Sequence, residues 1–156
     1  MKENKFRVYC EIEFEGKITK SMESPASWFL MTQTGKLWTY DPGEAPRPLE
    51  KEYKKAIPLF YTGLKDKNGK EIYEGDIIEQ TQRIYDNLKI KEHVFWDDSL
   101  VGFNPFADCD VILYGGMETV EIIGNIYENP ELLSGARNER AKIKKNKKNA
   151  LQSSLK

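Results

Sequence analysis

The sequence contains very few of the residues that usually bind metals or act as nucleophiles. Among its 156 residues there are two cysteines, Cys10 and Cys109, and one histidine, His93. Neither cysteine has a Cys or His nearby in the sequence, which excludes the usual ligand spacing of a zinc site. His93 and Cys109 are the one realistic nucleophile–base pair, and nothing in the sequence brings them together. We therefore expect no metal, no cofactor and no enzymatic activity.

Long apolar runs are absent as well. No stretch approaches the ~20 apolar residues that span a membrane, and the opening residues MKENKFRVYC lack the apolar core of an export signal. These absences predict a cytoplasmic protein of the host cell with reduced cysteines and no membrane partner. The hydrophobic fraction of 39% nevertheless excludes disorder on grounds of composition.

Phosphate-binding and calcium-binding motifs are also missing. Gly115-Gly116 lacks the Lys-Ser/Thr that follows the glycines of a phosphate-binding loop. Four aspartates flank a predicted loop without the spacing of a calcium loop: Asp97, Asp98, Asp108 and Asp110. We interpret them as a solvated acidic surface. A hydrolase that uses them is disfavoured, because no feature of the sequence supports the required acid–base geometry.

Alternating apolar and polar residues are frequent in the first half of the chain. Residues 6–14 (FRVYCEIEF) alternate with a period of two, which predicts a half-buried strand with Cys10 on its apolar face. A return strand is expected from Ile18. Residues 28–32 and 36–40 predict a second hairpin. Three prolines within residues 41–56 then predict a linker, because proline removes a backbone donor.

The second half shows the same short segments. Asn68-Gly69 is a tight-turn signal, and Gly75-Asp76 suggests a bulge or bend within a strand over residues 72–79. Further strands are expected at residues 88–96, 110–114 and 119–127, with a loop between Asp97 and Asp108 and a compact hairpin connection at 115–117. Asn129-Pro130 has the composition of a helix start.

These segments predict a mainly β fold, made of small antiparallel barrel or sandwich units and a short C-terminal helix. We expect N-terminal β hairpins and a proline-rich linker over residues 1–55. A small barrel-like unit is expected over residues 56–133. The last residues, 134–156, form a basic tail with too few apolar positions for a buried stripe.

Charge is divided unevenly along the chain. Residues 134–156 contain eight lysines and arginines and one glutamate, a net charge of +7, whereas residues 1–133 carry −8. A basic tail of this kind has two interpretations: it binds nucleic acid through phosphate contacts, or it is a solvated charged tail with no partner. The candidate residues are Arg137, Arg140, Lys142, Lys144, Lys145, Lys147 and Lys148.

Two segments resemble a known family. YTGLKDKNGKEIYEGDII (61–78) and EIIGNIYENPELL (121–133) are similar to the signature segments of the YopX family, and KFRVY (5–9) is similar to its usual start. The resemblance implies a mostly β fold with barrel-like parts and an origin in bacteriophages or prophages. It implies no catalytic residue and no cofactor.

The residues shared with the family have two interpretations. Most are turn and capping residues, such as Gly63, Gly75 and Gly124, whose backbone geometry restricts the choice of side chain. The other interpretation is a ligand site around Tyr73, Asp76 and Tyr127, since glycine also allows a ligand to approach the backbone. The first interpretation is favoured.

Two functions agree with these observations. The leading one is a non-enzymatic binding module in phage nucleic-acid metabolism or its regulation. The alternative is a protein–protein adaptor that acts on a host or phage protein through the acidic body. Exposed tryptophans could also stack on nucleobases, but the alternation in the strands favours core packing for most aromatics, among them Trp28, Trp38 and Trp96.

Overall fold

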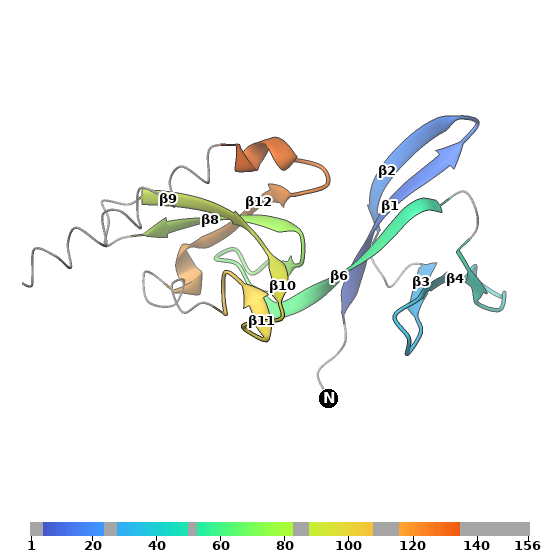
Figure 1. Cartoon of the computed structure of the whole chain (residues 1–156), viewed down its shortest axis with the longest axis horizontal. Helices are drawn as coiled ribbons and strands as arrows, with labels where there is room; N and C mark the ends of the chain where they lie inside the picture. Colours follow the sequence, from blue (N-terminus) through green and yellow to red (C-terminus); the bar gives the residue numbers. More distant parts are fainter. Residues whose placement is uncertain (1–4, 24–27, 50–52, 83–87, 108–115, 135–156) are drawn as a thin grey trace, which may run out of the picture. The chain divides into compact units, whose positions relative to one another are not determined.

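The computed structural model describes residues 5–23, 28–49, 53–82, 88–107 and 116–134 (Figure 1). The described chain is mainly β, and every strand pairing between named partners is antiparallel, as the sequence predicts. It divides into two compact units, Met1–Thr62 and Gly63–Lys156. Each unit has its own buried cluster of side chains.

The first unit is organised around one central strand. Strand β1 (Phe6–Phe14) pairs with β2 (Lys17–Glu23) on one side and with β6 (Tyr53–Lys65) on the other. A second sheet has the order β3-β4-β5 and consists of Phe29–Met31, Leu37–Thr39 and Arg47–Pro48. The core contains Phe6, Val8, Cys10 and Phe29.

Strand β1 follows the predicted alternation with one exception. Val8 and Cys10 are fully buried, which confirms the apolar face. Tyr9 alternates with Val8 and Cys10 and so lies on the opposite face, yet it is buried as well, and Lys55 Nζ lies over its ring at 5.9 Å from the centroid. Its hydroxyl donates to Glu11 Oε1 at 2.8 Å, which satisfies the buried polar end of the ring.

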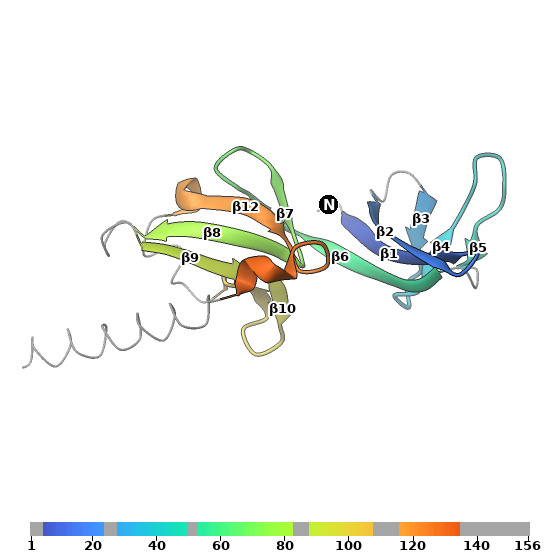
Figure 2. The ribbon, with the colours of Figure 1, turned by 90° about the horizontal axis from the view of Figure 1, so that it is seen from above.

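The second unit is built on a three-stranded sheet with the order β12-β8-β9 (Figure 2). Its strands are β8 (Asp76–Gln82), β9 (Leu88–His93) and β12 (Val120–Asn125). Strand β7 (Glu71–Tyr73) pairs with β6, and β10 (Phe95–Asp97) forms a hairpin with β11 (Gly102–Asn104). The core consists of Ile72, Ile78, Val94 and Val120.

Several predicted connections are different in the structure. The loop expected between Asp97 and Asp108 contains β11, which is too short to show a period. The connection expected at 115–117 overlaps a single 3-10 turn, η1 (Met117–Thr119), and Gly115 lies outside the described residues. The expected linker at 41–56 contributes β5 and the start of β6, whose residues 53–60 pair with β1. The strand expected at 110–114 lies outside the described residues.

The expected C-terminal helix is described only as a 3-10 turn, η2 (Pro130–Leu133). Asn129 precedes it, but its side chain does not cap the turn. It accepts instead from the backbone N–H of Asn125 at 3.4 Å. Within the part of the chain that the structure describes, no helix has the length and apolar character needed to cross a membrane.

The burial of Cys10 leads to a prediction about its reactivity. Burial, and to a lesser degree the nearby charge of Glu23, raises the pKa of the Cys10 thiol to about 12. The thiolate is the reactive form, so Cys10 should stay unreactive at neutral pH while the chain is folded. In a Cys109→Ser variant, a thiol reagent should label Cys10 only after denaturant is added. Rapid labelling of the native protein would contradict the buried position.

Candidate functional site

The first signature segment contains a buried carboxylate whose oxygens accept hydrogen bonds from backbone N–H groups. Asp66 Oδ1 accepts the N–H groups of Asn68 and Lys70, each at 2.9 Å, and so closes the predicted Asn68-Gly69 turn. Its other oxygen, Oδ2, accepts the N–H of Ile122 at 3.2 Å. Burial alone would raise the pKa of Asp66, but these three donors outweigh it and lower the pKa. The carboxylate therefore joins the two signature segments.

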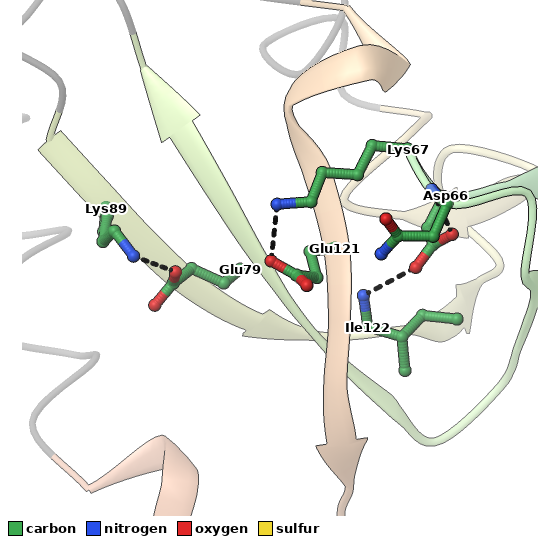
Figure 3. A network of polar contacts seen from close by, with 7 residues as sticks. Asp66, Lys67, Glu79, Lys89, Glu121 and Ile122 are labelled. Carbon is green, nitrogen blue, oxygen red and sulfur yellow. Dashed lines mark hydrogen bonds and ion pairs between the residues drawn. The ribbon is translucent and has the colours of Figure 1, made fainter.

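Ion pairs on the same sheet accompany this contact (Figure 3). Lys67 Nζ lies 2.6 Å from Glu121 Oε2, and Lys89 Nζ lies 2.6 Å from Glu79 Oε1. The hydrogen bond from Lys67 lowers the pKa of Glu121. The pairs are solvent-exposed, so each stabilises the fold only weakly. Their chemical consequence is that two lysines of this sheet are already neutralised.

The second contact between the signature segments surrounds Gly75. Its φ of +77° is a left-handed conformation that favours glycine. Gly75 N–H donates to the carbonyl of Val94 at 2.8 Å, and its own carbonyl accepts from Ile126 N–H at 2.8 Å. A Cβ at Gly75 would lie 3.0 Å from the ring of Tyr127. The bend predicted at Gly75-Asp76 is present, but it is a turn that separates two strands, β7 and β8, rather than a bulge within one strand. It is enclosed by the second signature segment.

The three predicted ligand residues lie at this turn. Asp76 is buried, and its Oδ2 accepts the N–H of Tyr73 at 2.8 Å. The Tyr73 hydroxyl donates to Glu71 Oε2 at 2.8 Å. Tyr127 covers Gly75 and donates its N–H to Asn125 Oδ1 at 3.0 Å. The structure brings the three together, and the polar groups named here bind within the protein. A ligand role for them stays a prediction.

The second signature segment closes on itself through two asparagines. Asn125 Oδ1 accepts from the N–H groups of Tyr127 and Glu128, and its amide group donates to the Glu128 carboxylate. Space above Gly124 is filled by the loop that follows: an added Cβ would meet Asn129 Oδ1 at 2.7 Å and Leu132 Cδ1 at 2.8 Å. Close packing favours glycine at position 124, because a larger side chain would require Asn129 and Leu132 to shift.

The structure reveals exposed residues that the alternation did not predict. Trp28 and Trp96, for which core packing was expected, are both exposed. Trp96 is on the β10–β11 hairpin, where a two-stranded sheet leaves one side of each strand uncovered. Asp97 and Asp98 belong to the same hairpin, whereas Asp108 and Asp110 lie outside the described residues. Within those described ranges, no group of three or more metal-ligating side chains occurs.

The remaining predicted residues are not brought into a site. His93 is half-buried, its ring stacks on Phe95 at a centroid distance of 5.0 Å, and burial lowers its pKa. Its proposed partner, Cys109, is outside the described residues. The basic tail residues from Arg137 to Lys148 are outside them too, so their proposed phosphate contacts stay a prediction.

The described geometry defines a class of protein: two small antiparallel β units, with two signature segments joined by buried polar contacts. The comparisons identify the family. A family model described as "YopX protein" matches residues 5–134, and the chain therefore belongs to the YopX family. The resemblance inferred from the two signature segments is confirmed.

The chain is similar to a solved structure that is described as the crystal structure of protein EF1440 from Enterococcus faecalis. The sequence identity is 24%, the match covers 83% of this chain and 97% of the other, and the TM-score is 0.46. No curated protein matches the sequence.

Substitution of Asp66 should destabilise the protein in a pH-dependent way. We expect Asp66→Asn to lower the free energy of unfolding by about 1–3 kcal/mol at neutral pH, because an amide cannot accept all three N–H groups. The pKa of Asp66 is lowered by folding, so its carboxylate contributes fully above its ordinary pKa of about 4. That contribution is lost as the pH falls through the lowered value.

Denaturant unfolding of both proteins at several pH values measures this effect. The difference between wild type and Asp66→Asn should shrink as the pH falls below about 4. Glu131→Gln, which changes an exposed carboxyl of the same unit, is the matched control and should behave as wild type. A constant difference at all pH values would show that the carboxylate charge does not matter.

A comparison of two glycines with similar φ distinguishes the cost of backbone strain from the cost of steric crowding when each is replaced by valine. Gly75 and Gly69 have φ values of +77° and +81°, but a Cβ at Gly69 meets nothing within 4 Å. We expect Gly75→Val to cost roughly 1–3 kcal/mol of unfolding free energy, and Gly69→Val to cost less, because only Gly75 is covered by Tyr127. Thermal melting of both variants tests this, and equal melting temperatures would exclude a contribution from Tyr127.

Proposed function

We propose that this chain is a non-enzymatic binding protein that associates with nucleic acid through its basic tail, in phage nucleic-acid metabolism or its regulation within the host cytoplasm. The observation that carries the proposal is the separation of charge. Residues 63–133 contain six lysines and arginines and fifteen aspartates and glutamates, a net charge of −9, and the next 23 residues carry +7. Residues 1–62 are close to neutral, at +1.

The polar chemistry of the second unit supports a binding protein rather than an enzyme. Asp66 and Asp76 accept backbone N–H groups, and Asn125 stabilises the turn that follows β12. Side chains occupied in this way are not available as general acids or bases. Lys67 and Lys89 are paired with glutamates, so they offer little attraction to phosphate. We therefore assign affinity for a polyanion to the tail, where the excess of positive charge is concentrated.

A protein–protein adaptor that acts on a host or phage protein is the second candidate. Two observations favour it: the net charge of −9 in residues 63–133, and the exposed apolar side chains of the β10–β11 hairpin. An acidic surface with apolar side chains suits a basic protein partner better than a nucleic acid.

A truncation that ends at Leu133 tests the leading proposal. The shortened protein should keep its melting temperature, because η2 ends at Leu133, and it should lose affinity for DNA and RNA. If about five tail residues bind phosphates, the full chain should show a slope of log affinity against log salt of roughly −4 to −5 on duplex DNA. Sequence preference should be slight.

The outcomes separate the two candidates. Equal binding by both proteins would place the site on the acidic body and defeat the proposal. Binding by neither protein would favour the adaptor. Loss of cooperative unfolding in the truncated protein would show that the tail is part of the fold.

A further inference from the structure

The β10–β11 hairpin concentrates exposed apolar side chains. We call residues 95–104 the aromatic hairpin. Eight large hydrophobic residues are exposed in the described chain, and half of them lie within residues 95–101: Phe95, Trp96, Leu100 and Val101. Val101 is 76% exposed and Trp96 is 45% exposed. Single exposed apolar residues are ordinary, but four of them within seven consecutive residues of one hairpin are unusual and indicate a candidate interaction surface.

The aromatic hairpin holds these side chains in place. Trp96 Nε1 donates to Asp98 Oδ1 at 2.9 Å, and the indole meets the Phe103 ring edge-on, with centroids 5.1 Å apart. Phe103 packs against the core cluster of this unit, so the ring that the indole contacts is itself held in place. Asp97 Oδ1 accepts both the N–H and the hydroxyl of Ser99. Side chains that are ordered in advance lose less entropy on binding.

Val101 has no evident role in folding. Its φ is +50°, a left-handed conformation that a β-branched residue rarely adopts. Because most of its side chain faces solvent, packing within the protein does not offset this strain. Strained residues of this kind are concentrated at functional sites. The side chain is therefore better explained by a contact with another molecule.

The charges around the aromatic hairpin indicate the chemistry of that molecule. Asp97 and Asp98 are at the tip, and Glu74 Oε1 accepts the Trp96 N–H at 3.2 Å. His93, stacked beneath Phe95, adds no positive charge at neutral pH, because burial lowers its pKa. Residues 63–133, which are the second unit without its basic tail, carry −9. This field repels a polyanion and attracts lysine and arginine.

We propose that the aromatic hairpin is a docking surface for a segment of a partner protein that presents apolar side chains between lysines or arginines. The apolar side chains of the segment pack against Trp96 and Val101. Its cationic groups pair with Asp97 and Asp98. This surface consists of residues other than those of the basic tail, so the inference goes beyond the nucleic-acid proposal and is tested independently of it.

The test uses the full chain and three short fluorescent probes: a peptide of alternating leucine and lysine, the same peptide with glutamate for lysine, and a single-stranded oligothymidine. We expect the lysine peptide to bind and the glutamate peptide not to bind, with Trp96→Ala weakening the lysine peptide about tenfold or more. Under the proposed function oligothymidine binds the basic tail, so Trp96→Ala should leave its affinity unchanged. Val101→Gly should weaken binding several-fold without lowering the melting temperature, because glycine accommodates the left-handed φ. Trp28→Ala changes an exposed tryptophan of the first unit and should have no effect.

Each other result overturns the proposal. Equal binding of the glutamate peptide would remove the electrostatic argument, and unchanged binding by Trp96→Ala and Val101→Gly would place the site elsewhere. Oligothymidine binding that Trp96→Ala abolishes would make the hairpin a base-stacking surface. A dimer in sedimentation that Trp96→Ala dissociates would make it a contact between two copies of this chain.

Discussion

The Asp66 carboxylate is the interaction on which the second unit depends. It accepts three backbone N–H groups, two from its own turn and one from Ile122, which is 56 residues further along the chain. A buried carboxylate is costly unless such donors surround it. Once it is satisfied, it fixes the turn beside β12, and Lys67 N–H then donates to the carbonyl of Val120 at 2.9 Å. One side chain thereby joins a local turn to a distant strand.

Close contacts within the second unit also explain why the family segments have the composition of turns and caps. Gly75 leaves room for Tyr127, and Gly124 leaves room for Asn129. The side chain of Asn125 stabilises the turn between Gly124 and Asn129, because its Oδ1 accepts the N–H of Tyr127. The contacts of these positions in the described chain are packing contacts. Exposed side chains that take no part in this packing offer a different surface. The aromatic hairpin is the clearest such surface in the described chain.

Sequence analysis predicted features that depend on neighbouring residues. The alternation in residues 6–14 predicted β1, and Asn68-Gly69 predicted a turn, because both signals are local. It did not predict that Asp66 would bind Ile122, since no periodicity connects positions so far apart. It also assigned Trp96 to the core, because alternation shows that a strand has two faces but not whether both are covered.

Because the loop packs closely over Gly124, substitutions at three positions depend on one another. Its missing side chain leaves the space that Asn129 and Leu132 fill, at 2.7 and 2.8 Å from where a Cβ would be. A mutation to alanine at this glycine is therefore tolerated only if the loop above it shortens a side chain or moves. Substitutions at Gly124, Asn129 and Leu132 should occur together as the family diverges, because a change at one position limits the side chains that fit at the other two.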